Sequence, residues 1–68
     1  MEISARNQLS GRVTAISLGT VMAEVRIQVG QHEVVSAITR SSVERLGIRV
    51  GDEVVAIIKA TEVMVGKP

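Results

Sequence analysis

Cysteine, phenylalanine, tyrosine and tryptophan are all absent from this chain of 68 residues, which has one histidine and one proline. The absence of cysteine excludes disulfides, and a lone His32 cannot build a structural zinc site with sulfur ligands. The absence of aromatic rings removes the platforms on which single-stranded nucleic acid bases stack in small β-barrels. We therefore expect no disulfide scaffold, no cofactor and no metal ion ligated directly by the protein.

Charge excess and long apolar runs are also missing. Eight Lys and Arg residues against seven Asp and Glu give a formal net charge of +1, so no broad field attracts a polyanion. The apolar runs are only a few residues long, well short of the ~20 residues that span a bilayer. No signal-peptide pattern opens the chain. These observations predict a cytoplasmic protein with no membrane segment, for which nucleic acid is an unfavoured partner.

The size of the chain points to association. With 46% apolar residues it can form one domain over residues 1–68, but a domain this short buries a smaller share of its surface than a larger one. Disulfides, a structural metal or oligomerisation usually stabilise such domains. Because the first two are excluded, we expect a homo-oligomer.

Apolar and polar residues alternate along much of the chain, which is typical of half-buried β-strands. The clearest alternation covers residues 21–29, and an earlier one covers residues 9–18. One face of the earlier strand is expected to carry Leu9, Gly11, Val13 and Ala15.

Three further segments predict strands. Residues 32–39 are rich in the β-branched side chains that fit a pleated sheet. Residues 54–58 are apolar at every position, which implies that one face of this strand is buried by the core and the other by a neighbouring subunit. Residues 63–65 are expected to form a fifth and last strand.

A short helix is predicted between the third and fourth strands. Ser41 and Glu44 match a capping box, in which Ser41 accepts from the Glu44 N–H and the Glu44 side chain reaches back. Gly47 can take the left-handed conformation that ends a helix. Five strands with one helix in this place give the element order of an all-β OB-fold, a small Greek-key barrel.

Two segments near the ends of the chain concentrate donors that suit an oxyanion. Ser4, Ala5 and Arg6 precede the first strand, where backbone N–H groups are not yet committed to a sheet. Lys59 and Ala60 follow the fourth strand, with a threonine hydroxyl next in sequence. The alternatives are an ordinary polar arm at the N-terminus and, for Lys59, a lysine that protects a strand end from aggregation.

Thr39 and Ser42 lie at the predicted start of the helix, close to N–H groups that attract anions. The alternative for this pair is helix capping alone. If Ser41 is the cap, Ser42 is free to donate to a ligand. The carboxylates are dispersed over all elements, and no nucleophile lies with a base, so the sequence offers no basis for catalysis.

The segments 4–8 and 59–63, with 37–47 and 51–54 between them, resemble the molbindin family of TOBE-type molybdate and tungstate binding domains. The resemblance covers essentially the whole chain. It implies an OB-fold subunit that assembles as a hexamer, a trimer of dimers, and holds molybdate or tungstate at subunit interfaces for storage and homeostasis.

Residue by residue, the resemblance implies that one subunit reaches the oxyanion with Ser4, Ala5 and Arg6. The opposing subunit would contribute Thr39, Ser42, Lys59 and Ala60. Many relatives have serine at the position of Ala60, so here only the backbone N–H remains available at that position.

Two other interpretations stay open. Residues 46–54 resemble part of the swapped-hairpin transcription regulators, small oligomeric proteins that bind DNA through basic arms. This chain lacks the Ile-Pro-Lys type of lead into the helix, and its basic residues are not clustered. The second alternative is a ligand-sensing module whose effector domain is a separate polypeptide.

Overall fold

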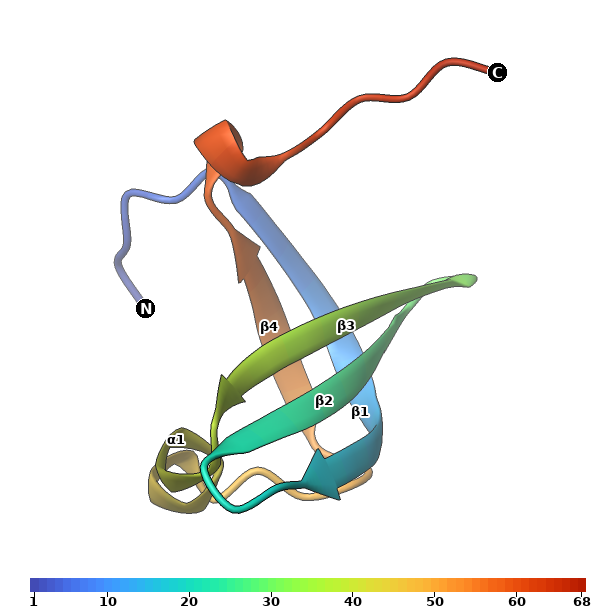
Figure 1. Cartoon of the computed structure of the whole chain (residues 1–68). Helices are drawn as coiled ribbons and strands as arrows, with labels where there is room; N and C mark the ends of the chain where they lie inside the picture. The colour runs from blue at the N-terminus through green and yellow to red at the C-terminus, as the bar shows by residue number, and fades with distance from the viewer.

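Four antiparallel strands form one sheet in the order β3-β2-β1-β4 in the computed structural model, which describes residues 1–68. Figure 1 shows this sheet with a helix near one end of the molecule and a short 3-10 turn near the other. In chain order the elements are β1 (Asn7–Leu18), β2 (Met22–Val29), β3 (His32–Thr39), α1 (Arg40–Leu46), β4 (Glu53–Ile58) and the 3-10 turn η1 (Ala60–Glu62). No helix is long and apolar enough to cross a membrane.

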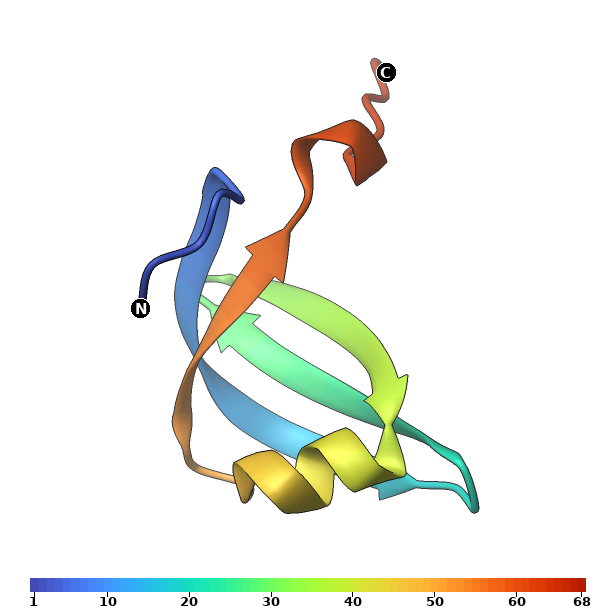
Figure 2. The ribbon, with the colours of Figure 1, turned by 90° about the vertical axis from the view of Figure 1, so that its left-hand side faces the viewer.

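Strand β1 belongs to both halves of the sheet. Its first half pairs with β4, from Asn7 opposite Ile58, and its second half pairs with β2. At Gly11 an added Cβ would lie 2.5 Å from the Gln28 carbonyl oxygen, so only glycine fits where β1 passes β2 this closely. The strand therefore bends across the molecule and carries the sheet around the core (Figure 2).

A register shift between Val13 and Ala15 interrupts the alternation of β1. Val13 is fully buried, but Ala15 is exposed and Ile16 turns inward instead. One extra residue in a strand reverses the faces that follow it. The prediction that Ala15 shares a face with Val13 was therefore wrong, because the bulge depends on pairing with β2.

The core is small and wholly apolar. It lies between the curved sheet and α1, and only six of the 68 residues are buried. They are Val13, Ala23, Val25, Ile27, Val43 and Ala56. Alternate residues of β2 supply three of them, as the sequence predicted, and Val43 closes the core from the helix.

Helix α1 has Thr39 as its N-cap, two residues earlier than the predicted cap Ser41. The Thr39 hydroxyl accepts from the Ser42 N–H at 3.1 Å, and the Glu44 carboxylate accepts from Arg40 Nε at 2.9 Å. The predicted capping box of Ser41 and Glu44 was wrong, because the end of β3 already places Thr39 at the cap. Gly47 ends the helix with a φ of 66°, which confirms its predicted role.

The all-β, OB-like class with a short helix between β3 and β4 is confirmed, but the strands number four and not five. Val63, Met64 and Val65 form no strand and are exposed by 50%, 93% and 93%. Strand β4 has one inward face, while Val55 and Ile57 remain partly exposed. A single chain therefore buries only one of the two faces of β4 that the sequence predicted to be buried.

Candidate functional site

The two donor segments meet because β1 begins where β4 ends. Asn7 is paired with Ile58 in the sheet, and the Asn7 side-chain amide donates to the Ile58 carbonyl at 3.1 Å. The N-terminal arm and η1 therefore lie side by side at one end of the molecule (Figure 1). The Gln8 amide also donates to the Ala5 carbonyl at 2.7 Å, which holds the arm in place.

An open hollow of about 390 Å³ lies between these segments. It is lined by Ser4, Ala5, Arg6, Lys59, Ala60 and Thr61. Two cations and two hydroxyls line it, and no carboxylate does. The structure thus brings together five of the seven residues that the sequence singled out.

One residue that lines the hollow, Thr61, was not among the predicted binding residues. Thr61 adds a second hydroxyl, which follows Lys59 by two positions and faces the same hollow. The signal in the sequence was a hydroxyl directly after a cation and a small residue. The 3-10 turn produces the placement, since the Glu62 N–H donates to the Lys59 carbonyl at 2.9 Å and curls the chain around the hollow.

Thr39 and Ser42 lie elsewhere, because Thr39 is the N-cap of α1 and Ser42 is in its first turn. Helix α1 lies at the opposite end of the molecule from η1 (Figures 1 and 2). Thr39 Oγ1 accepts the Ser42 N–H and lies 2.7 Å from Ser42 Oγ. Thr39, and not Ser41, therefore caps the helix, while a role of Thr39 and Ser42 in ligand binding stays a prediction. Thr39 also borders a second polar hollow with Thr20, Val21, Arg40, Ser41 and Glu44.

Three arginines outside the hollow differ from its two cations, because each of the three is paired with a carboxylate. Arg12 pairs with Glu53 at 2.9 Å, and Arg40 pairs with Glu44 at 2.9 Å. Arg26 contacts Glu33 at 2.6 Å and Glu24 at 2.8 Å. The hydrogen bond to Glu33, followed by the charge of Glu24, raises the pKa of Arg26 above its ordinary value.

By contrast, neither Arg6 nor Lys59 forms an ion pair within the chain. The hollow therefore presents two uncompensated positive charges with hydroxyl donors beside them. Such a set can hold a small anion by charge-assisted hydrogen bonds and offers no base to accept a proton. Nowhere do three or more His, Asp or Glu side chains gather as a metal site would need.

Comparison with known proteins gives concordant matches along the chain. The family model described as TOBE domain matches residues 3–65. Molybdenum-pterin-binding protein 3 of Clostridium pasteurianum is 48% identical over 66 residues, which make up 96% of this chain and 97% of that protein.

Two solved structures share both fold and sequence with the chain. The structure of a molybdate binding protein from Sporomusa ovata has a TM-score of 0.94 and 46% identity, covering 98% of this chain and 100% of that one. The cytoplasmic molybdate-binding protein ModG, solved with molybdate bound, has a TM-score of 0.93 and 39% identity. That match covers 100% of this chain and 49% of ModG.

Proposed function

This chain belongs to the TOBE domain family, whose molybdenum-pterin-binding relatives are binding proteins, and from that membership we propose that it binds molybdate. The membership confirms the resemblance seen in the sequence and the expectation that the chain is not an enzyme. Nothing in it favours the swapped-hairpin alternative.

The observation that carries the proposal is the hollow between the arm and η1. Molybdate is a tetrahedral dianion with no proton to give at neutral pH, so its site needs donors and cations only. Arg6 and Lys59 supply the charge, and the hydroxyls of Ser4 and Thr61 with nearby backbone N–H groups supply further donors. Because no carboxylate lines the hollow, a dianion meets no repulsion there.

We propose further that the binding site is completed at a subunit interface. The hollow is open to solvent, so one chain does not surround an anion there. Thr39 and Ser42 belong to the start of α1, which lies at the opposite end of the molecule (Figure 1), so they can reach the same anion only from a second chain. A homo-oligomer, the hexamer that the resemblance implies, would bring the two ends of different chains together. The ligand-binding set would then be Ser4, Ala5, Arg6, Thr39, Ser42, Lys59 and Ala60, with Thr61 added.

The physiological role that fits this design is storage and homeostasis of molybdate or tungstate in the cytoplasm. A binding domain without a catalytic group can bind and release its ligand reversibly. The relative ModG is described as a cytoplasmic molybdate-binding protein, which supports the same location. Tungstate has the same shape and charge as molybdate and is the proposed second ligand.

Calorimetric titration with molybdate, repeated in excess sulfate, tests the proposal, and the mass of the oligomer is determined on the same sample. Sulfate shares charge and shape with molybdate but is smaller, so it leaves donors under-satisfied at a cost of ~1 to 3 kcal/mol for each. We expect saturable binding that survives sulfate. Absence of heat with molybdate and with tungstate would overturn the proposal.

Arg6→Ala tests the site itself, and Arg49→Ala is the matched control, since Arg49 is exposed, unpaired and outside the hollow. Loss of a charge-assisted hydrogen bond costs roughly 1.5 to 3 kcal/mol, which corresponds to an affinity loss of about tenfold or more. The control is expected to bind as the unaltered chain does. Equal affinity in both variants would remove Arg6 from the site.

A further inference from the structure

Each of the two donor segments is tied to the sheet by one side-chain amide. Residues 1–6 form no backbone hydrogen bond, and the donor of Gln8 provides their only hydrogen bond to the rest of the chain. Residues 59–68 form hydrogen bonds only among themselves, and Asn7 donates to the residue just before them. Two neighbouring side chains therefore hold the arm and η1 beside each other.

Gln8 holds the peptide group that leads into Arg6. Its side-chain amide donates to the Ala5 carbonyl at 2.7 Å. Because a peptide group is planar, the Ala5 carbonyl and the Arg6 N–H share one plane, and a hydrogen bond to the carbonyl orients both. The Arg6 Cα belongs to the same plane. The bond therefore also sets the point from which the Arg6 side chain leaves the backbone.

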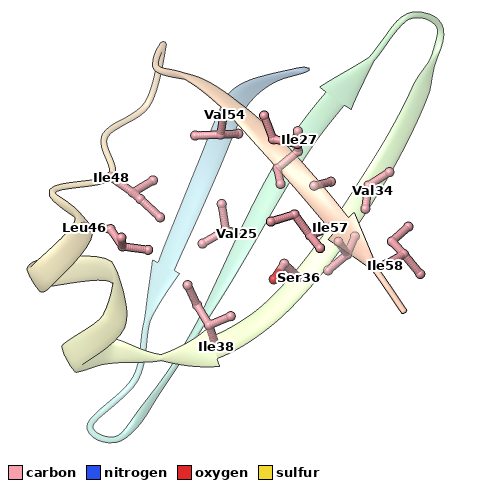
Figure 3. A pocket seen from close by; sticks show the side chains of 13 residues that line it. Val25, Ile27, Val34, Ser36, Ile38, Leu46, Ile48, Val54, Ile57 and Ile58 are labelled. Atoms are coloured by element: carbon pink, nitrogen blue, oxygen red, sulfur yellow. The ribbon is translucent and has the colours of Figure 1, made fainter. Parts of the chain in front are cut away.

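Asn7 acts in the same way on Lys59. Its side-chain amide donates to the Ile58 carbonyl at 3.1 Å, which orients the peptide group between Ile58 and Lys59. This bond is partly buried, and the Ile58 side chain lines an apolar groove between β3 and β4 (Figure 3). Ile58 is thus held at both its carbonyl and its side chain, so Lys59 leaves the backbone from a fixed point.

Repulsion between the two cations opposes the arrangement that an anion needs. Arg6 and Lys59 both line the hollow, and no carboxylate there offsets their charges. Because like charges repel, an arm without its hydrogen bond would carry Arg6 away from Lys59 in the absence of an anion. An anion would then have to order the arm as it binds, and that ordering lowers affinity. The two amide bonds place both cations in advance.

We propose that Asn7 and Gln8 are positioning residues for the oxyanion. Gln8 acts through Arg6, and Asn7 acts through Lys59. Neither amide lines the hollow, so neither is assigned a contact with the anion. The inference rests on the proposed function, because it requires that the hollow between the arm and η1 binds molybdate. It adds two residues outside the binding set and states which cation each of them serves.

Removal of each amide by a substitution of similar size tests the inference without a change of charge. Gln8→Met and Asn7→Leu keep the size of the side chain and delete the donor. We expect the molybdate affinity of each variant, measured by calorimetric titration, to fall about threefold to tenfold, because the freed segment must be ordered on binding. Gln8→Met should keep the urea unfolding midpoint of the unaltered chain, since the bond that it removes is exposed and outside the core.

Two controls make the same kind of change away from the hollow. Gln28→Met deletes an exposed glutamine amide that donates to a backbone carbonyl at 2.7 Å, the distance also found for Gln8. Thr14→Val deletes a hydroxyl of β1 that donates to a carbonyl of β2 at 3.3 Å, and it is the control for Asn7→Leu. Both controls should bind molybdate as the unaltered chain does. Affinity losses in the controls as large as those in Gln8→Met and Asn7→Leu would contradict the inference.

Double variants show which cation each amide serves. If Gln8 acts through Arg6, Gln8→Met should change affinity by less than about twofold in the Arg6→Ala chain and should retain its full loss in the Lys59→Ala chain. Asn7→Leu should give the reverse. An amide with a merely structural role would give the same loss in both chains, and that result would overturn the inference.

The single variants separate a failure of this inference from a failure of the proposed function. Losses of affinity in Arg6→Ala and Lys59→Ala, with none in Gln8→Met and Asn7→Leu, would exclude the positioning role and leave the site in place. Unchanged affinity in Arg6→Ala and Lys59→Ala would exclude the site and the positioning role together. Circular dichroism of each variant establishes that it is folded, and Gln8→Met alone decides the outcome if Asn7→Leu does not fold.

Discussion

The two ends of the molecule carry similar polar side chains but differ in what those side chains already bind. At the end formed by the arm and η1, Arg6 and Lys59 have no carboxylate partner, and hydroxyls line an open hollow. At the helix end, Arg40 pairs with Glu44, and the Thr39 hydroxyl caps α1. A donor serves a ligand most readily where the fold does not already use it, so residue type alone does not identify a site.

Charge reversal at the open end is expected to have the largest effect. Lys59→Glu removes a cation and places a carboxylate against a dianion, so molybdate affinity should fall by at least ~100-fold, about 2.7 kcal/mol. Stability should change little, because Lys59 is exposed and unpaired. Calorimetric titration measures the loss, and Lys67→Glu, outside the hollow, is the control. Similar affinities for the two variants would exclude Lys59 from the site.

Removal of the cap at the helix end should affect stability. Thr39→Ala deletes the acceptor of the Ser42 N–H, and loss of an N-cap costs about 1 kcal/mol. Urea unfolding measures the change, and Thr39→Ser, which keeps the acceptor, should restore most of it. If Thr39→Ala unfolds as the unaltered chain does, the cap contributes nothing and the contrast between the two ends is lost.

Ser42→Ala then separates capping from ligand binding across an interface. Its hydroxyl contacts Thr39 Oγ1, but its backbone N–H makes the cap bond. Stability should therefore stay within about 0.5 kcal/mol of the unaltered chain. We expect molybdate affinity to fall if the helix end of one chain meets the hollow of another. Unchanged affinity would place Ser42 outside the proposed interface site.

Loss of one hydroxyl at the open end should be milder than loss of its charge. Thr61→Val keeps the shape of the side chain and removes one neutral donor, a change that costs about 0.5 to 1.5 kcal/mol. A molybdate affinity about threefold weaker is expected by calorimetry. Thr14→Val, on β1 away from the hollow, is the control for the same chemical change. A loss as large as that of Lys59→Glu would contradict the ranking of charge above hydroxyl.

The smallest effect is expected for a change that leaves Arg40 at the helix end without its carboxylate partner, as Arg6 and Lys59 are at the open end. Glu44→Gln frees Arg40 from an exposed pair four residues apart, and such pairs contribute about 0.3 to 0.5 kcal/mol. Urea unfolding should show a change of this size. Calorimetry should show no additional molybdate bound per chain, since one freed guanidinium supplies less charge than the two cations of the hollow. An extra site would mean that ion pairing alone had kept this end closed to anions.

Several features of fold and site were readable from the sequence because they depend on neighbours along the chain. The alternation of β2 placed Ala23, Val25 and Ile27 in the core, and Gly47 marked the end of α1. Donor-rich segments at both ends named five residues of the hollow. By contrast, the bulge in β1 turned Ala15 outward, because its position depends on pairing with a strand distant in sequence.

The choice of cap shows the same limit at shorter range. Ser41 and Glu44 fit the capping pattern by spacing, but the end of β3 positions Thr39 first. Thr39 is the last residue of β3 and pairs with Met22 of β2, and the Arg40 N–H donates to the Val21 carbonyl at 2.8 Å. The helix therefore starts where the pairing of β3 with β2 ends. A local sequence pattern does not show where that pairing ends.

The sequence by itself determined the alternation of the strands, the C-terminal end of the helix at Gly47 and the kinds of donor at each end of the chain. These features follow from side-chain chemistry and short-range geometry. The tertiary structure decided that Asn7 pairs with Ile58, which joins the two donor segments into one hollow. It also decided that residues 63–65 form no strand within the chain, although their side chains favour one. A strand is stable only beside another strand, and sequence alone does not show whether that neighbour is in the same chain.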